Sequence, residues 1–251
     1  MVVKQYKVNT SKSIRIKIAI LADIHGKCNK KTLKYMSQFN PDIIAIPGDL
    51  VDQKHLLSNK LLDFLVECIH IAPTFFSFGN HDVWLTPLDI DTMKRIGVHI
   101  LDNEWLQIEE DLYIGGITST SVLRHKCLDN NRFQSTTIVD VSWIERIKQK
   151  ESFKIILDHH PENYAIYTRN MDVDIVISGH THGGQISVFG LWPSKLAKQN
   201  GWFKYRGGIY DNKLIVSRGI TNTMMIPRIG NPTELVIVDI RKQKDEGGLF
   251  L

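Results

Sequence analysis

Short apolar segments alternate with amphipathic segments along the first part of the chain. Residues 16–22, 42–46 and 74–78 are rich in β-branched or aromatic side chains, and we expect them to be strands. Residues 30–39 and 56–71 instead carry apolar side chains at helical spacing. Because strands that read as continuous apolar runs are buried on both faces, this alternation predicts an α/β core with parallel pairing.

The later part of the chain is richer in strand patterns. Residues 105–109 and 112–117 predict a hairpin, and residues 153–157 and 173–177 predict two further strands. The segment between them, residues 141–149, is expected to be a helix.

The C-terminal third continues this strand-rich character. We expect strands at residues 185–188, 213–217 and 234–240, followed by a loose tail at 242–251. No linker or internal repeat interrupts the sequence, so residues 1–251 are interpreted as a single domain. The whole pattern predicts two sheets packed face to face inside helical layers.

Composition is that of an ordinary globular protein. Hydrophobic residues make up 43% of the chain and charged residues 23%. The formal charge of +4, from 31 basic and 27 acidic residues, is a weak excess that disfavours a nucleic-acid partner. Three widely spaced cysteines, Cys28, Cys68 and Cys127, suggest no disulfide framework and fit a reducing compartment.

The N-terminal segment favours a cytoplasmic protein. Residues 1–13 are polar and contain several lysines, without the apolar core of a secretion signal. The apolar stretch that follows, residues 14–22, is too short and too charged to span a bilayer. We therefore expect neither an export signal nor a transmembrane segment.

Metal-binding residue types recur directly after the predicted strands. The turn at residues 179–184 follows an apolar run and holds His180 and His182 between glycines. Two histidines at this spacing are well suited to coordinating a metal ion. Further residues of these types at strand ends are Asp23, His25, Asp49, Asn80, His81, Asp82, His159 and His160. One Asp-x-His alone also fits a capping aspartate beside an unrelated histidine. Five such strand ends in one chain predict a shared site, because open α/β sheets bind ligands at the carboxyl ends of their strands.

The mixture of ligand types indicates which metals and which chemistry to expect. Two divalent ions about 3.5–4 Å apart need a bridging anion, and a carboxylate fills that role. Imidazoles together with carboxylates suit manganese, iron and zinc better than an all-oxygen magnesium site. A water held between the ions loses a proton near neutral pH and becomes a nucleophile. The sequence therefore predicts a two-metal phosphoesterase.

In their order, these blocks resemble those of the calcineurin-like metallophosphoesterase superfamily, over residues 23 to about 240. The resemblance implies a four-layer α/β/β/α sandwich of two mixed sheets. It also implies that a hydroxide bridging two metals attacks phosphorus, with Mn²⁺ the expected ion and Fe, Zn or Ni the alternatives. The implied ligands are Asp23, His25 and His182 for one metal, Asn80, His159 and His180 for the other, and Asp49 as the bridge.

Three further roles follow from the same resemblance. His159 is preferred to His160 as the lone ligand, because the family block resembles His-x-Pro and Pro161 stands two residues after His159. His160 then either faces the substrate pocket or is a surface imidazole. His81 would stabilise the phosphoryl charge or protonate the leaving oxygen. Asp82 would orient the His81 ring, although it also fits a helix cap.

Other segments bear on the substrate. Residues 179–185, 217–219 and 231–235 resemble a bacterial branch that includes membrane-associated phosphoesterases and UDP-2,3-diacylglucosamine pyrophosphate hydrolases. Asn80 and Arg218 are both candidate substrate ligands, and Arg218 would bind phosphate through its guanidinium or else form a surface ion pair. Basic and aromatic residues interleave over residues 190–210, where they would either hold a lipid headgroup, nucleobase or membrane surface or pack onto the domain.

The function predicted from the sequence is hydrolysis of a phosphate ester or pyrophosphate bond in a small substrate, lipid-linked or nucleotide, with a peripheral place at the inner membrane surface left open. A nuclease or cyclic-nucleotide-type phosphodiesterase is the alternative enzyme. A binding scaffold without catalysis is a third hypothesis, but it predicts broken ligands, and all seven are present.

Overall fold

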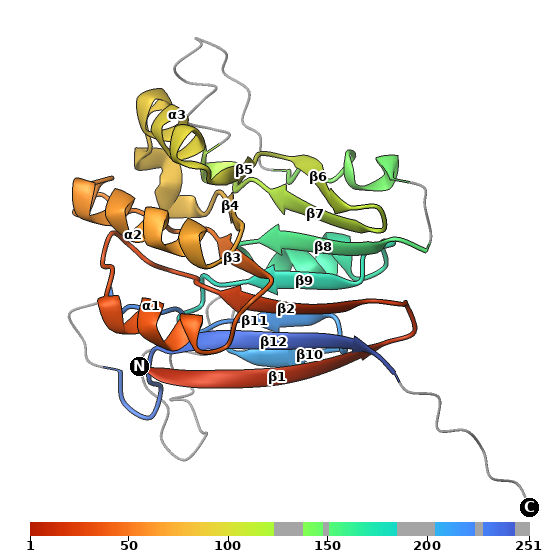
Figure 1. Ribbon diagram of the computed structural model, residues 1–251. Helices are drawn as coiled ribbons and strands as arrows, with labels where there is room; N and C mark the ends of the chain where they lie inside the picture. Colours follow the sequence, from red (N-terminus) through yellow and green to blue (C-terminus); the bar gives the residue numbers. More distant parts are fainter. Residues whose placement is uncertain (123–137, 148–150, 185–203, 224–227, 244–251) are drawn as a thin grey trace, which may run out of the picture.

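Two stacked β-sheets form the centre of the molecule (Figure 1). The computed structural model describes residues 1–122, 138–147, 151–184, 204–223 and 228–243. Each sheet has six strands within these residues, and each mixes parallel with antiparallel pairs. The predicted α/β class with two mixed sheets is therefore confirmed.

The first sheet is parallel except at one place. Its strands, in spatial order, are β1 (Val2–Thr10), β12 (Glu234–Lys242), β2 (Arg15–Ile20), β3 (Ile43–Pro47), β4 (Thr74–Ser77) and β5 (His99–Leu101). β12 runs parallel to β1 but antiparallel to β2. A strand from late in the chain thus separates the first two strands.

The second sheet has antiparallel pairs at both edges. Its order is β10 (Gly208–Tyr210), β11 (Leu214–Val216), β9 (Ile175–Ser178), β8 (Phe153–Asp158), β7 (Leu112–Ile117) and β6 (Glu104–Glu109). The β6–β7 hairpin that the sequence predicts is confirmed. The central strands β7, β8, β9 and β11 are mutually parallel, so their carboxyl ends meet at one edge.

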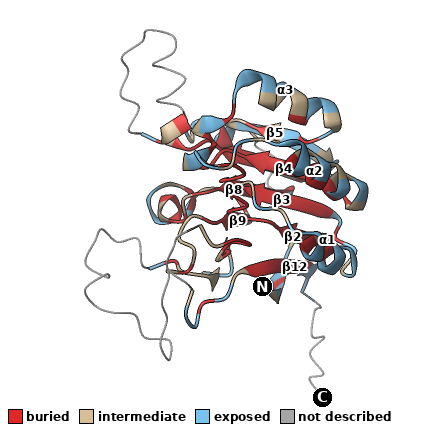
Figure 2. Ribbon diagram, turned by 90° about the vertical axis from the view of Figure 1, so that its left-hand side faces the viewer, coloured by how far each residue is buried: buried red, intermediate tan, exposed pale blue. Residues whose placement is uncertain are grey.

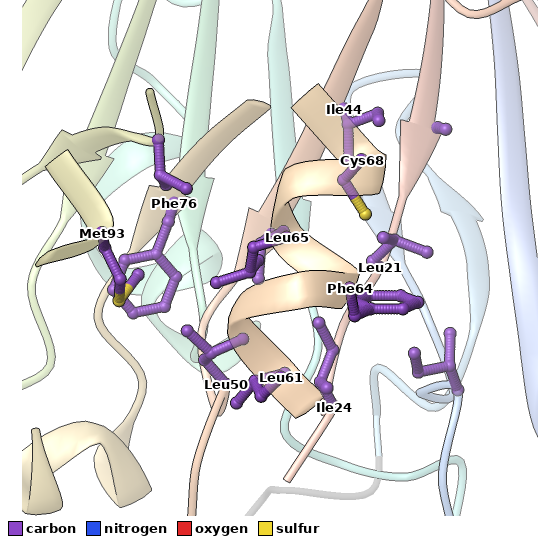
Figure 3. Close-up of a cluster of buried hydrophobic side chains, with 14 of the residues drawn as sticks. Leu21, Ile24, Ile44, Leu50, Leu61, Phe64, Leu65, Cys68, Phe76 and Met93 are labelled. Atoms are coloured by element: carbon purple, nitrogen blue, oxygen red, sulfur yellow. The ribbon is translucent and has the colours of Figure 1, made fainter. Parts of the chain in front are cut away.

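Three α-helices cover the outer face of the first sheet (Figure 1): α1 (Lys30–Ser37), α2 (Asn59–Ile71) and α3 (Pro87–Ile96). The side chains of α2 that face the sheet pack on strand residues such as Ile44 and Phe76 (Figure 3). Ser58 caps α2 by accepting the N–H of Leu61, which explains why this helix begins at residue 59 and not at residue 56.

A second core fills the space between the sheets. Ile18 and Ile20 of β2 belong to this core together with Ile155 and Leu157 of β8, and all four are fully buried. The strands in the middle of both sheets are buried along most of their length, whereas the outer surfaces of the helices are exposed (Figure 2). This arrangement matches the continuous apolar runs in the sequence.

The outer face of the second sheet carries short helical turns. They are η2, a 3₁₀ turn at Ile144–Arg146, and η3, a π-helical segment at Tyr164–Thr168. The predicted helix at residues 141–149 is wrong over its described part, because the chain is already extended at Ile147. Instead, this turn places the buried Trp143 ring against Trp105 and over Gly115, where an added Cβ would lie 2.8 Å from the ring.

Several elements were not expected from the sequence, among them the short strands β5 and β10. They also include β1, at residues that we described only as a polar N-terminal segment, and α3, which the Thr86–Asp89 capping box starts and left-handed Gly97 ends. The predicted strand at residues 185–188 and the tail from residue 244 lie outside the described residues. Among the described helices, none has the length and apolar character needed to cross a lipid bilayer.

Candidate metal centre

The predicted ligands follow strands whose carboxyl ends meet at one edge of the molecule. Asp23 and His25 follow β2, Asp49 follows β3 and Asn80 follows β4 in the first sheet, while His159 follows β8 and His180 and His182 follow β9 in the second. The sandwich therefore brings together residues that are more than 150 positions apart, such as Asp23 and His180, whose N–H donates to Asp23 Oδ1 at 3.1 Å.

Six of the seven predicted ligands fall into two clusters. One consists of Asp23, His25 and His182, and the other of Asp49, His159 and His180; in each, one ligand atom per residue lies within 4.8 Å of the others. The first cluster matches the predicted set for one metal. The second contains two of the residues predicted for the other metal and the predicted bridge.

Asp49 lies between the two clusters. Its Oδ2 is 3.2 Å from Nε2 of His159 and 3.6 Å from Nε2 of His25. One carboxylate therefore faces an imidazole from each cluster, which is the position that a bridging ligand needs. Asn80 belongs to the same group, because its Oδ1 lies 3.1 Å from Nε2 of His159.

The donor atoms fit divalent cations. Among the described residues, Asp23 Oδ2 and His25 Nε2 are buried without a hydrogen-bond partner. Buried polar atoms are rarely left unsatisfied, and such exceptions call for an ion or another functional cause. Carboxylate and imidazole donors gathered around such atoms are a set that manganese, iron or zinc accepts.

Close packing of two loops holds this centre in place. Gly79 lies so near to Asp49 that an added Cβ would be 2.3 Å from its Oδ1. Gly48, at φ +91°, approaches Gly79 equally closely, with an added Cβ 2.6 Å from the Gly79 Cα. Neither position has space for a side chain, and the left-handed φ of Gly48 also disfavours any other residue there. Only glycine therefore fits at both positions.

Most of the candidate ligands have an unusual backbone. The residues with left-handed φ values are Asp23 (56°), His25 (47°), Asp49 (54°), His180 (68°) and His182 (49°). Residues other than glycine adopt this conformation at a cost of about 1 kcal/mol or more, and such positions cluster at functional sites. The left-handed backbone of the turns after β2, β3 and β9 thus sets the direction of these side chains.

Burial keeps three of the histidines neutral. It lowers the pKa of His25 to about 4, against the opposing effect of Asp49. Burial also lowers the pKa of His180 well below its usual value, with the nearby His159 as the next cause, and lowers that of His182. A neutral imidazole has the lone pair that a metal needs, so these three are ready to act as ligands.

His159 and Asp49 form a buried charged pair. Burial opposes the charge on His159, but Asp49 outweighs it and raises the pKa of His159 to about 10. Burial likewise opposes the charge on Asp49, and His159 still brings the pKa of Asp49 below its usual range. His159 Nδ1 lies 2.9 Å from the Pro47 carbonyl, which fixes the ring so that Nε2 points at the centre.

His81 lies at the rim of the centre. Its side chain is exposed, its backbone N–H donates to Asp49 Oδ1 at 2.8 Å, and its ring lies edge-on to the His25 ring at 5.1 Å. It is therefore adjacent to both ligand clusters while open to solvent. This position is compatible with the predicted contact to a substrate, which stays a prediction.

Asp82 does not orient the His81 ring in the described structure. Its buried carboxylate accepts backbone N–H groups over 2.7–3.2 Å, and these belong to Gly79, Asp49, Leu50 and Val51. The bond to Gly79, at the start of η1 (Asn80–Trp84), is the helix-cap role that the sequence left open. Asp82 thus holds the loop after β3 against the loop after β4.

His160 and Arg218 lie beside the centre and have partners of their own. The His160 ring is 4.4 Å from the His180 ring, and it lies 3.0 Å from Ser119 Oγ and 3.2 Å from Glu162. Arg218 donates through Nε to the buried Glu234 at 2.8 Å. Their predicted contacts with substrate stay predictions, and the ion-pair alternative for Arg218 is present, with a buried partner.

The described part of residues 190–210 supports packing onto the domain. Tyr205 is buried, and its ring lies edge-on to those of Tyr164 and Tyr210 at 6.0 and 5.0 Å. Lys204 lies over the Tyr205 ring at 5.2 Å. Residues 190–203, which include the two tryptophans of this segment, lie outside the described residues.

Arg228 was not predicted from the sequence. Its Nη2 lies 2.8 Å from His182 Nδ1, and its Nη1 donates to the Arg218 carbonyl at 2.6 Å. The guanidinium therefore contacts a candidate ligand on the side away from Asp23. No local motif marks this arginine, since its neighbours are apolar residues, a proline and a glycine.

Two stacked mixed sheets with two ligand clusters at their carboxyl edge are typical of a metallophosphoesterase. A comparison of the sequence with known families confirms this class. Residues 16–184 match the model of the calcineurin-like phosphoesterase family, so the chain belongs to that family. Its members bind divalent metals and hydrolyse phosphoesters, which agrees with the predicted hydrolase class.

Several bacterial proteins are similar over most of this chain. An uncharacterized metallophosphoesterase of Campylobacter jejuni is 28% identical over 91% of this chain, which spans 60% of that relative. Another of Aquifex aeolicus is 26% identical, covering 95% of this chain and 91% of the relative. YkoQ of Bacillus subtilis, also an uncharacterized metallophosphoesterase, is 27% identical, covering 90% and 84%. The predicted likeness to UDP-diacylglucosamine hydrolases stays a prediction.

Among solved structures, a dimetal phosphatase from Danio rerio aligns with 10% identity and a TM-score of 0.44, covering 67% of this chain and 82% of that chain. A Thermus thermophilus protein aligns with 11% identity and a TM-score of 0.43, covering 67% and 83%. The family assignment does not depend on these alignments, because the sequence match supplies it.

Proposed function

We propose that this protein hydrolyses a phosphate ester or pyrophosphate bond with the help of two divalent metal ions. Asp23, His25 and His182 would hold one ion, and Asn80, His159 and His180 the other, with Asp49 shared between them. The single observation that carries the proposal is the position of Asp49, whose one oxygen faces a histidine of each cluster.

The protein's own residues would divide the remaining work. When bound, the metal pair supplies positive charge for the phosphoryl oxygens and a deprotonated water as the nucleophile. His81, at the exposed rim, would donate a proton to the leaving oxygen or stabilise charge on the phosphoryl group. Asn80 would contribute its amide both to the metal and to the substrate. Asp82 would act on the reaction only by holding these loops in register.

The donor set favours Mn²⁺, with Fe, Zn and Ni as alternatives. Four of the seven candidate ligands are imidazoles, and imidazole suits these ions better than Mg²⁺ or Ca²⁺. The substrate we expect is a small phosphorylated compound, lipid-linked or nucleotide. The phosphodiesterase or nuclease alternative uses the same centre and differs only in what binds beside it.

Hydrolysis of chromogenic esters tests the proposal. Metal-stripped protein is repleted with Mn²⁺, Zn²⁺ or Mg²⁺ and assayed with bis-p-nitrophenyl phosphate beside p-nitrophenyl phosphate. We expect metal-dependent turnover of at least one ester, highest with Mn²⁺. The preferred compound would then distinguish a diesterase from a monoesterase.

Substitution of the shared carboxylate is the matching genetic test. Asp49→Ala should abolish turnover and reduce the number of bound metal ions, whereas Asp63→Ala, on the exposed face of α2, should change neither. Normal turnover by metal-replete Asp49→Ala would overturn the bridging role. A folded wild-type protein that binds two metals but hydrolyses neither these esters nor a pyrophosphate would support the scaffold hypothesis instead.

A further inference from the structure

A small pocket lies next to the metal centre, at the side of the sandwich where β1 and β10 form the edges of the two sheets (Figure 1). Its volume is about 290 Å³. The residues that matter for its chemistry are Lys4, Tyr6, Gly183, Arg206, Arg218 and Asn231. Neither ligand cluster of the metal centre contributes a side chain to it.

The lining of this pocket is cationic. Three basic side chains, Lys4, Arg206 and Arg218, come from three separate parts of the chain. None of the described residues that line the pocket carries a carboxylate. A compensating charge behind this lining is Glu234, which is fully buried and accepts hydrogen bonds from Nε and Nη2 of Arg218. Three positive groups against one buried negative group favour an anionic ligand.

Packing fixes the Arg218 side chain in this wall. An added Cβ at Gly183 would lie 2.7 Å from the Arg218 Cδ, and one at Gly207 would lie 2.8 Å from its Cγ. The aliphatic stem therefore runs between two glycines, in space that a side chain at either position would fill. A guanidinium held in this way binds an anion without losing further conformational freedom.

Tyr6 adds a neutral hydrogen-bond donor. Burial and the negative charge of Glu234 raise the pKa of its phenol, so the hydroxyl keeps its proton at physiological pH. Lys4, two residues earlier on β1, points to the same face of the strand, because side chains alternate along a strand. Charged and neutral donors thus converge, as sites for phosphoryl groups require.

The pocket and the metal centre are built from the same loops. Gly183 directly follows His182, and Asn231 donates through Nδ2 to the His182 carbonyl at 2.8 Å. Gly219, which directly follows Arg218, packs against Asp23, where an added Cβ would lie 2.8 Å from the Asp23 Cβ. A substrate bound at the metals therefore has this pocket as an immediate neighbour.

We propose that this pocket binds a second phosphoryl group of the substrate, while the phosphoryl group that is attacked lies at the metal centre. The substrate class is then a small molecule with two phosphoryl groups, joined as a pyrophosphate or carried close together. This inference rests on the proposed function, which it narrows from phosphorylated compounds in general.

Inhibition by nucleotides that differ by one phosphoryl group tests the assignment. ADP and AMP serve as probes that compete with bis-p-nitrophenyl phosphate in the Mn²⁺-loaded protein. ADP should inhibit about tenfold more tightly than AMP, since a charge-assisted contact of this kind is worth about one power of ten in affinity. Equal inhibition by the two nucleotides in the wild type would overturn the proposal.

Three variants locate the effect. Lys4→Gln and Arg206→Gln should each weaken ADP inhibition about five- to tenfold and leave AMP within twofold. The matched control is Lys7→Gln, an exposed lysine on the same strand outside the pocket lining, which should leave both unchanged. Retained ADP preference in Arg206→Gln and Lys4→Gln, or an equal loss in Lys7→Gln, would contradict the assignment.

A binding measurement separates this inference from the proposed function. Calorimetric titration of metal-free protein with ADP and AMP needs no turnover, so it reports on the pocket even if no ester is hydrolysed. ADP should bind more tightly than AMP, and Arg206→Gln should remove the difference. If ADP inhibits without competing with the ester, the pocket is a separate site for a phosphorylated effector. Its proposed role in substrate binding is then wrong.

Discussion

Asp49 and His159 form a charged pair, with 3.2 Å between Oδ2 and Nε2, at the point where the two ligand clusters meet. Both groups are buried, and each stabilises the charged form of the other. In the metal-free protein, a proton on His159 therefore occupies the position that a metal ion would take.

Metal binding should consequently depend on pH. The pKa of His159 is raised from 6.5 to about 10 in the folded protein. Its proton therefore stabilises the metal-free protein fully below pH 6.5, and this contribution is lost as the pH rises towards 10. Because a metal must displace that proton, affinity should rise up to about tenfold per pH unit over this range.

Calorimetry at pH 6.5, 7.5 and 8.5 measures this dependence, and buffers of different ionisation enthalpy count the protons released. His159→Gln should remove the dependence together with one metal. The control is His70→Ala on the exposed side of α2. Affinity that stays constant across these pH values would contradict the account of the Asp49–His159 pair.

His81→Ala should separate catalysis from metal binding. His81 contacts the centre through its backbone N–H, and alanine keeps that donor, so both metals should remain bound. Loss of an acid or charge-stabilising group should lower kcat by about 10²–10⁴-fold. The measurements are metal content by elemental analysis and turnover of the preferred ester. Full activity of this variant would exclude the proposed acid role.

Asp82→Asn should damage the loops of the centre. Each carboxylate oxygen of Asp82 accepts two backbone N–H groups. In asparagine one of these oxygens becomes an NH₂ group, which is itself a donor, so two backbone N–H groups would lose their acceptor. Leaving buried N–H groups unsatisfied should cost about 2–4 kcal/mol of unfolding free energy.

Denaturant unfolding of the metal-free protein gives that free energy, with Asp63→Asn on α2 as the control. Metal affinity should fall in Asp82→Asn, since Asp49 lies in the displaced loop. An unchanged unfolding free energy combined with a loss of turnover would instead restore the role that the sequence suggested, orientation of His81.

Arg228→Gln should strengthen metal binding. The guanidinium Nη2 lies 2.8 Å from His182 Nδ1 and adds a positive charge beside the cluster of Asp23, His25 and His182. A histidine that binds metal through one nitrogen normally donates from the other, so a donor at Nδ1 opposes ligation through Nε2. Glutamine removes the positive charge and can turn its amide oxygen to accept from Nδ1, so affinity should rise several-fold, whereas His182→Gln should lower it. Competition titration with a chromogenic chelator measures both, and weaker binding by Arg228→Gln would contradict this interpretation.

The sequence predicts best where local and tertiary signals agree. β3 and β8 are buried on both faces, and their continuous apolar runs made them visible. The residues that follow these strands, Asp49 and His159, were recognised as members of a family pattern, and the topology brings them together.

Other elements depend on partners that a local pattern does not show. β1 pairs with β12, a strand more than 230 positions away, and only Val8 among its nine residues is buried, so no continuous apolar run marks it as a strand. By contrast, α3 carried a readable signal in Thr86, Pro87 and Gly97. The pocket that includes Lys4 and Arg206 depends on the same long-range pairing, which is why Lys4 was not predicted to belong to a site, whereas Arg206 lies in the basic and aromatic segment 190–210 that the sequence had marked.

The place of β12 between β1 and β2 has a consequence for biogenesis. During synthesis, β1 leaves the ribosome early but has no neighbour to pair with until Glu234–Lys242 has been made. Until then β2, which leads to Asp23 and His25, is itself an open sheet edge. The nascent chain therefore carries four of the seven candidate ligands on a sheet that stays incomplete until β12 has been made, and metal binding should follow the synthesis of that strand.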